Sequence, residues 1–253
     1  MKTVKRYQKT VIAFIALLGG VFVWTLTAGD LNPPAPPTSG TMKTLNDVEA
    51  RIPLADSQTP AGTLTISQPG SYYLTGDRYC SGSGIYINAD NVTLDLNGYS
   101  LIGPGALETD PPANGIYFSP HRNVEIRNGT VTNFRYDGVN HTYGEDGAEG
   151  IRILNIRAVG NGSEGIRLDG KGHLVDGCTV QGNGDHGIVL VSSGSRVSNN
   201  IVSLNQKNGI YLANGTTNCL FIHNIAFDNN QAGGSYINLS APATCSKIEN
   251  HAP

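Results

Sequence analysis

A step of glycine followed by isoleucine or valine recurs along most of this chain. Gly165, Gly187 and Gly209 lie 22 residues apart, and isoleucine follows each of them. A fixed period of roughly 20–50 residues is typical of solenoids, in which each repeat buries its apolar side against its neighbours. The repeat therefore predicts a stack of similar coils. The clear steps are Gly84-Ile85, Gly115-Ile116, Gly138-Val139, Gly165-Ile166, Gly187-Ile188 and Gly209-Ile210, and Ser235-Tyr236-Ile237 is a weaker seventh.

Apolar and polar residues alternate after each step, as in Ile85-Tyr86-Ile87 and Ile210-Tyr211-Leu212. A period of two indicates short strands with one buried side. A second set of such segments ends in asparagine or Asp-Gly, as in Val92–Asn97, and interleaves with the first. Thirty-two glycines and only 15% charged residues also fit a turn-rich, all-β chain. The fold predicted is an all-β, single-stranded parallel β-helix of about seven coils, which stack at about 4.8 Å.

The chain divides into four expected segments. Residues 1–28 combine four basic residues with an apolar run, which indicates an export signal, either cleaved or kept as a membrane anchor. Residues 29–40 form a Pro-rich linker. Residues 41–80 are expected to be an N-terminal cap, with a short helix over 43–50, and the first strands. Residues 81–253 are expected to form the solenoid, with long loops at Gly103–Asn114 and Asn140–Glu149.

Charge narrows the partners that we expect. Loss of residues 1–28 would change the formal net charge from −3 to −7. An acidic chain without a basic face is a poor ligand for phosphate backbones, so we expect no nucleic-acid partner. The protein is predicted to be secreted, periplasmic or on the cell surface, and it would contact a membrane only through an uncleaved N-terminal segment.

Two columns of outward side chains carry the candidate chemistry. The residue before each glycine step should stack from coil to coil, and so should the second residue after the glycine. The first column is Asn114, Asp137, Glu164, His186 and Asn208. The second column is Tyr86, Tyr117, Asn140, Arg167, Val189 and Tyr211.

Asp137 and Glu164 are predicted to lie about 5 Å apart on adjacent coils. Repulsion between them would raise one pKa and leave an acid beside a base, as glycosidases require. Asp137, Glu164 and His186 are therefore the candidate catalytic residues. The candidate substrate-binding residues are Tyr117, Asn140, Arg167, Asn208 and Tyr211. Among these, the tyrosines could stack on sugar rings, and Arg167 could pair with a uronate.

Cys219 and Cys245 both precede an asparagine, Asn224 and Asn250, by five residues. This spacing places them on neighbouring coils, where stacked Cα atoms fall within the range of a disulfide. An exported chain favours such a bond. Free, buried thiols are the alternative, and Cys178 is expected to be an apolar filler.

Residues 61–250 resemble the pectin-lyase-like superfamily of right-handed parallel β-helices. Thr41–Pro53 and Gly70–Thr75 resemble the entry segment of its exported bacterial members. The resemblance implies a right-handed solenoid. Family 28 polygalacturonases carry acidic residues and a histidine before successive coil steps. The similar run here is Tyr136-Asp137-Gly138, Ser163-Glu164-Gly165 and Asp185-His186-Gly187.

The chain departs from that family at two places. Ser163-Glu164-Gly165 has one carboxylate where the family has two, and Tyr211-Leu-Ala213 stands where the family has Arg-Ile-Lys. The resemblance implies a glycoside hydrolase, and the departures put galacturonate recognition in question.

Three functions stay open on this sequence, all with polysaccharide as the partner. The first is a glycoside hydrolase that needs no cofactor. The second is a non-catalytic carbohydrate-binding or cell-surface structural solenoid. The third is a polysaccharide lyase, with Arg167, Lys171 or Lys207 as base and Ca²⁺ held by Asp137, Glu164 or Asp169. The histidines show no metal-ligand spacing, so no metal is otherwise expected.

Overall fold

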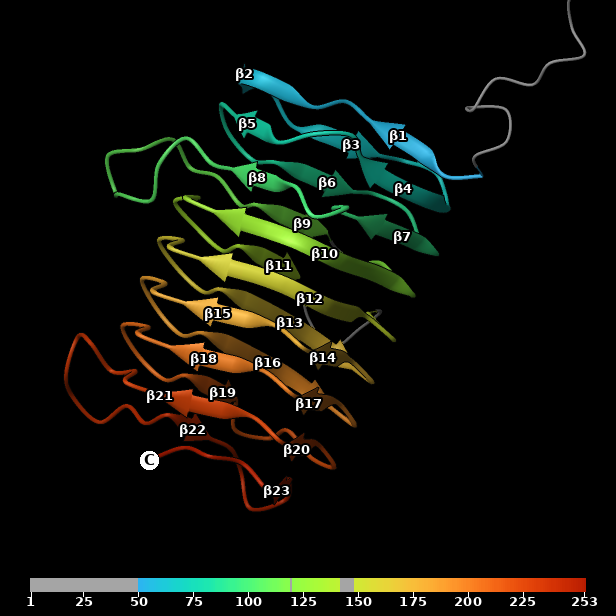
Figure 1. Ribbon diagram of the computed structural model, residues 1–253. Helices are drawn as coiled ribbons and strands as arrows, with labels where there is room; N and C mark the ends of the chain where they lie inside the picture. Colours follow the sequence, from blue (N-terminus) through green and yellow to red (C-terminus); the bar gives the residue numbers. More distant parts are fainter. Residues whose placement is uncertain (1–49, 119, 142–147) are drawn as a thin grey trace, which may run out of the picture. The chain divides into compact units, whose positions relative to one another are not determined.

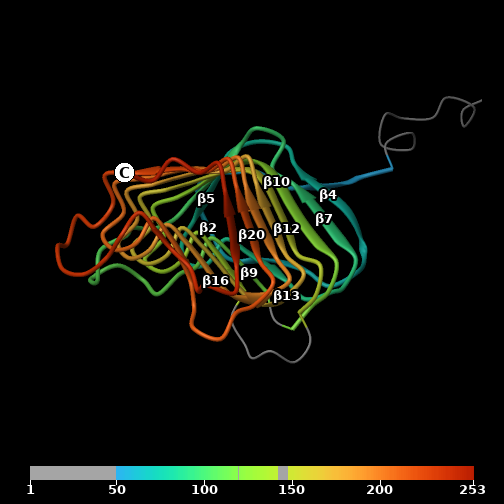
Figure 2. The same ribbon diagram turned by 90° about the horizontal axis from the view of Figure 1, so that it is seen from below.

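The computed structural model describes residues 50–118, 120–141 and 148–253, and within them it contains 23 β-strands and no helix. The expected export segment, the linker and nearly all of the expected cap helix lie outside the described residues. Figure 1 shows the strands stacked in sequence order from β1 to β23. Seen along the stack in Figure 2, successive coils overlie one another.

The strands that follow the glycine steps form one ladder, and the number of its strands gives the number of coils. It has eight strands, one from each coil, in the order β22-β19-β16-β13-β11-β9-β6-β3. The estimate of about seven coils is therefore close. The strands are β3 (Leu64–Ile66), β6 (Ile85–Ile87), β9 (Ile116–Phe118), β11 (Val139–His141), β13 (Ile166–Lys171), β16 (Ile188–Ser193), β19 (Ile210–Leu212) and β22 (Leu239–Ser240).

The other strands form a second, 15-stranded sheet with two ladders, which the long strands β10 and β12 join. One ladder is β1 (Ile52–Leu54), β4 (Gly70–Leu74), β7 (Val92–Asp95), β10 (Val124–Thr132), β12 (Arg152–Val159), β14 (Leu174–Asp176), β17 (Arg196–Ser198), β20 (Leu220–Ile222) and β23 (Ser246–Ile248). The other ladder adds β2 (Ser57–Ala61), β5 (Arg78–Cys80), β8 (Ser100–Ile102), β15 (Thr179–Gln181), β18 (Ile201–Ser203) and β21 (Ile225–Phe227). Strands from Ile52 onward thus belong to the solenoid.

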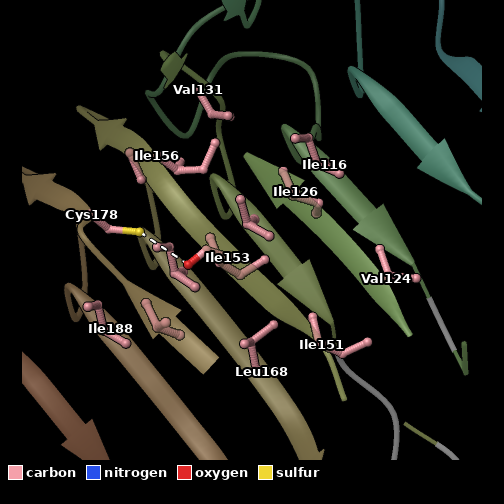
Figure 3. Close-up of a cluster of buried hydrophobic side chains, with 14 of the residues drawn as sticks. Ile116, Val124, Ile126, Val131, Ile151, Ile153, Ile156, Leu168, Cys178 and Ile188 are labelled. Carbon is pink, nitrogen blue, oxygen red and sulfur yellow. Dashed lines mark hydrogen bonds between the residues drawn. The ribbon is translucent and has the colours of Figure 1, made fainter. Parts of the chain in front are cut away.

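The core lies between these ladders and consists of stacked apolar side chains. Ile116, Val139, Ile166 and Ile188 are paired in register through parallel strands, and all are fully buried. Figure 3 shows part of this cluster, with Ile116 and Ile188 among the aliphatic side chains. Burial of each such side chain contributes about 1.5–3 kcal/mol. A single coil could not bury these side chains without its neighbours.

Glycine precedes these core strands because the coils approach too closely for a side chain. A Cβ atom at Gly187 would lie 2.4 Å from Cγ1 of Val202 and 2.5 Å from the carbonyl oxygen of Gly209 on the next coil. Both distances are shorter than van der Waals contact. The glycine of the repeat is therefore required by packing between coils.

Asparagine has two roles in this fold, at left-handed corners and in inward ladders, and the ladders do not follow from the repeat. At corners such as Asn155 and Asn199 the backbone is left-handed, with φ of 53° and 58°. Elsewhere asparagines point inward and form ladders. The ladders are Asn161, Asn183, Asn205, Asn229 and Asn238 in one file and Asn200, Asn224 and Asn250 in another.

Asn183 shows how each rung works. Its side-chain oxygen accepts hydrogen bonds from the backbone N–H and the amide of Asn161, at 3.0 and 3.1 Å. Its own amide donates to Ala158 O at 3.1 Å and to the side-chain oxygen of Asn205 at 2.9 Å. The ladder therefore supplies hydrogen-bond partners for buried backbone groups at a corner, where strand pairing does not supply them.

Replacement of Asn183 by alanine should lower the free energy of unfolding by about 2–4 kcal/mol, because it leaves buried N–H and C=O groups without partners. Chemical denaturation measures this loss. The exposed Asn214→Ala is the matched control and should change stability by less than about 0.5 kcal/mol. Equal losses in the two variants would contradict a special role for the ladder.

Cys219 and Cys245 are both buried and stand on neighbouring coils, since Ser246 N–H donates to Cys219 O at 2.9 Å. Burial and the adjacent Cys245 thiol raise the pKa of Cys219. All four thiols are free in this structure, so the disulfide stays a prediction. Cys178 is fully buried within the core and donates to Ile153 O, as the dashed line in Figure 3 indicates.

We expect Cys219 and Cys245 to be joined when the protein is made in an oxidising compartment. Mass spectrometry without reduction should then show a mass lower by two hydrogens, and the Cys178→Ser control should leave this difference unchanged. A bond that closes such a loop contributes about 2–4 kcal/mol to stability. Full reaction of both thiols with an alkylating reagent in the unfolded, unreduced protein would contradict the bond.

Candidate functional site

The middle residues of the strands in the eight-stranded sheet form one column on its outer side, as the repeat predicts, although Val189 in this column is buried. Strand register aligns Tyr86, Tyr117, Asn140, Arg167, Val189 and Tyr211 on successive coils. The residues before the glycine steps form a second column beside it. We call the two columns together the polar strip. Its members are Tyr86, Tyr117, Asn140, Arg167, Val189 and Tyr211 with Asn114, Asp137, Glu164, His186 and Asn208.

The column before the glycines also links the coils, through hydrogen bonds from the backbone of one coil to side chains of the next. Asn114 Oδ1 accepts the backbone N–H of Asp137 at 3.1 Å, and Asp137 Oδ1 accepts that of Glu164 at 3.0 Å. His186 Nδ1 accepts the N–H of Asn208 at 3.0 Å, and Asn208 Oδ1 accepts that of Ile237 at 2.6 Å. These side chains therefore have a structural role whatever chemistry they perform.

Asp137 and Glu164 form an acid–base pair at the centre of the strip. Asp137 is only 4% exposed. Burial, a hydrogen bond with Glu164 and the charge of Glu164 raise the pKa of Asp137 to about 7. Burial alone would raise the pKa of Glu164 too, but the hydrogen bonds from Asp137 and Ser163 and the charge of Arg167 lower it. The two carboxyl groups therefore share one proton, and the direction of both pKa shifts favours Asp137 as its site.

Asn140 completes the surroundings of the pair. It follows Asp137 by three residues, and its amide donates to Asp137 Oδ2. The other oxygen of Asp137 already accepts the Glu164 N–H. Both Asp137 oxygens are thus engaged by the protein, so a ligand would reach this carboxyl by replacing one of these partners.

Arg167 lies between two carboxylates on the strip. Its Nη1 is 3.6 Å from Glu164 Oε1, and its Nε is 3.4 Å from Asp169 Oδ1. Burial raises the pKa of Asp169, although the charge of Arg167 opposes that effect. The guanidinium that was expected to meet a substrate therefore has two protein partners.

His186 lies one coil beyond Glu164 and forms an aromatic cluster. Its ring stacks on Tyr211 at 5.0 Å with an interplanar angle of 16°, and Tyr236 meets it edge-on at 5.8 Å. Burial lowers the pKa of His186, and its Nδ1 accepts the Asn208 N–H. The neutral ring therefore carries its proton on Nε2.

Two contacts beside the candidate site were not predicted from the sequence. Tyr236 enters the aromatic cluster from the weak seventh repeat. Asp185 Oδ2 forms an ion pair with Lys207 Nζ at 2.6 Å, and Asp185 Oδ1 lies 3.4 Å from His186 Nε2. Because Asp185 and Lys207 are 22 residues apart, the repeat itself could have revealed their pairing.

A second aromatic pair lies at the other end of the strip. The rings of Tyr86 and Tyr117 stack at 4.7 Å with an interplanar angle of 16°. Burial and the neighbouring Tyr86 raise the pKa of Tyr117. The carboxyl pair thus lies between two stacked ring pairs along the polar strip.

Other features lie away from this pair. A cavity of about 290 Å³ opens at the carboxyl ends of β13 and β16, whereas Asp137 and Glu164 lie where β11 and β13 begin. Lys171, which borders that cavity, pairs with Glu149 at 3.0 Å. The described residues contain no group of three His, Cys, Asp or Glu side chains that could hold a metal ion. They also contain no helix that could cross a membrane.

Several solved structures share this fold at low sequence identity. The Dettilon tailspike protein matches with a TM-score of 0.53 and 17% identity, over 79% of this chain and 41% of the tailspike. A periplasmic alginate epimerase matches with a TM-score of 0.46 and 16% identity, over 75% of this chain and 49% of the epimerase. A pectate lyase matches with a TM-score of 0.42 and 16% identity, over 76% of this chain and 68% of the lyase.

The chain thus spans less than half of the tailspike and of the epimerase. At this identity the likeness concerns the fold. No curated protein sequence matches the chain. Residues 83–250 match the family model described as the right handed beta helix region. Since this match covers most of the solenoid and more than half of the chain, the protein belongs to the right-handed β-helix family.

Proposed function

We propose that the polar strip binds an extended polysaccharide along the solenoid axis. The observation that carries this proposal is the strip itself, in which stacked rings, at Tyr86–Tyr117 and at His186–Tyr211, lie on either side of polar side chains along the solenoid axis. Tyr117 and Tyr211 are four coil steps apart, which is about 19 Å at the usual strand spacing. This length suits several sugar rings.

The chemistry of the strip suits sugars. A pyranose ring has apolar C–H groups that pack on an aromatic ring, and hydroxyl groups that exchange hydrogen bonds. The half-buried rings of Tyr117 and Tyr211 supply the aromatic surface. His186 Nε2–H is a donor on the same face, because Nδ1 is already an acceptor. The side chains are held by coil stacking, so little conformational entropy would be lost on binding.

We expect Tyr117→Ala and Tyr211→Ala each to weaken polysaccharide binding about three- to tenfold, which corresponds to the loss of one ring contact. Affinity electrophoresis in gels that contain xylan, galactomannan, mixed-linkage glucan, pectate or alginate measures this change. Tyr79→Ala is the matched control, because Tyr79 is 39% exposed on β5, in the other sheet. Unchanged migration of both strip variants, with wild-type binding intact, would contradict the strip as the binding surface.

Glycoside hydrolysis is the second candidate, and the Asp137–Glu164 pair favours it. In that reaction Asp137 would donate its proton to the glycosidic oxygen, and Glu164 would take a proton from the water that attacks the anomeric carbon. Carboxyl groups that act in this inverting manner stand about 6.5–9.5 Å apart, to leave room for the water, whereas these two share a hydrogen bond. Hydrolysis therefore requires the glycosidic oxygen to replace Glu164 as the partner of the Asp137 proton.

If the pair is catalytic, Asp137→Asn and Glu164→Gln should each lower the release of reducing ends by about 10²–10⁴-fold. The rate should fall as pH rises through about 7, because the raised pKa of Asp137 makes it lose its proton there. The rate should also fall in acid, at a pH below the usual pKa range of a glutamate. The pKa of Glu164 is lowered, so Glu164 keeps its negative charge down to that pH.

Asp228→Asn is the control for this experiment, since Asp228 is an exposed carboxyl on a turn outside the strip. It should leave the rate unchanged. A wild-type protein that binds a polysaccharide but releases no reducing ends from it would exclude hydrolysis of that polymer and leave the non-catalytic binding function.

A further inference from the structure

Arg167 on the polar strip and Lys207 beside the strip are already paired with carboxylates of the protein. Arg167 lies between Glu164 and Asp169, and Lys207 is 2.6 Å from Asp185. We propose that the strip selects uncharged polysaccharides and rejects polyuronates. This inference rests on the proposed polysaccharide-binding function and names the class of polymer bound.

A uronate could pair with Arg167 only by displacing carboxylates that have little contact with water. The side chains of Glu164 and Asp169 are 12% and 13% exposed. Removal of their counter-charge would leave two poorly solvated anions, which is strongly unfavourable. Charge-assisted pairing of a sugar carboxylate with Arg167 would therefore be offset by the loss of the pairs that it replaces.

Lys207 offers no easier partner. Its hydrogen bond with Asp185 raises the pKa of Lys207, so the ammonium group is stabilised by that partner. Its Nζ also lies 5.8 Å from the ring centre of Tyr236. A sugar carboxylate at this position would meet the Asp185 carboxylate at close range.

The balance of charge around the carboxyl pair also opposes a polyanion. Around the carboxyl pair, the ion pairs of the described residues contain two cations, Arg167 and Lys207, and three carboxylates, Glu164, Asp169 and Asp185. Asp137 adds a further negative charge once it loses its proton. Like charges within a Debye length, about 8–10 Å, repel at ordinary ionic strength. The field of the strip thus disfavours a polymer with a carboxylate on every sugar.

The neighbouring Arg135 is directed elsewhere. Its Nη1 donates to the backbone oxygen of Asp110 at 2.8 Å, and its guanidinium lies over the ring of Tyr136 at 5.6 Å. A neutral sugar requires none of these cations. It needs the rings of Tyr117 and Tyr211 and hydroxyl partners, and it leaves every ion pair of the strip in place.

The test compares binding of length-matched oligosaccharides from xylan, galactomannan and mixed-linkage glucan with those from polygalacturonate and alginate. Isothermal titration calorimetry on the full chain should show a neutral ligand bound at least about tenfold more tightly than either uronate, with little dependence on salt. Equal or tighter uronate binding that weakens with salt would overturn the inference and leave polysaccharide binding intact. Binding of neither class, across the whole panel, would refute the proposed function itself.

Asp169→Asn provides a direct test of the cause. It removes one partner of Arg167 without altering the Asp137–Glu164 pair, and it should raise polygalacturonate affinity about threefold or more. Glu249→Gln is the matched control, because it removes one exposed carboxylate that pairs with His223 outside the strip. An Asp169→Asn variant that binds polygalacturonate no better than the control would show that ion pairing of Arg167 does not determine the selectivity.

Discussion

The structure depends on the stacking of each coil on the next in exact register. Main-chain hydrogen bonds between parallel strands require that residues at one position of the repeat lie against residues at the same position in adjacent coils. Identical residues then become neighbours, and most of these positions hold residues that interact favourably with a residue of the same type. Isoleucines fill the core, asparagines bond to asparagines, and glycines allow the close approach at each step.

Charged residues do not gain from this arrangement, because like charges in facing positions repel. The polar strip contains the exception, with Asp137 directly before Glu164 in the column. Burial and the charge of Glu164 raise the pKa of Asp137 to about 7, and a proton shared between the two carboxyl groups relieves their repulsion below that pH. Arg167 further limits the cost of this pair by neutralising Glu164.

The sequence predicted those features that follow directly from the repeat. The order of the outward columns, the inward isoleucines and the proximity of Asp137 to Glu164 all follow from the spacing of the glycine steps. Left-handed corner asparagines such as Asn155 are expected in a tightly turning chain, but the inward ladder did not follow, because a ladder residue such as Asn183 looks like a corner residue in sequence. The partners of Arg167 depend on side-chain conformation, which the period of a repeat does not specify.

Coil stacking also joins structure and chemistry in the same side chains. Asp137 accepts the Glu164 N–H with one oxygen and is bound by Asn140 through the other, so its position is set by the fold before any ligand arrives. Preorganised groups of this kind lose little freedom on binding. The same contacts mean that a sugar must compete with protein partners for Asp137, whereas it can pack on the exposed parts of the Tyr117 and Tyr211 rings while these rings stay stacked on Tyr86 and His186. Binding on the strip is therefore less demanding than hydrolysis at its centre.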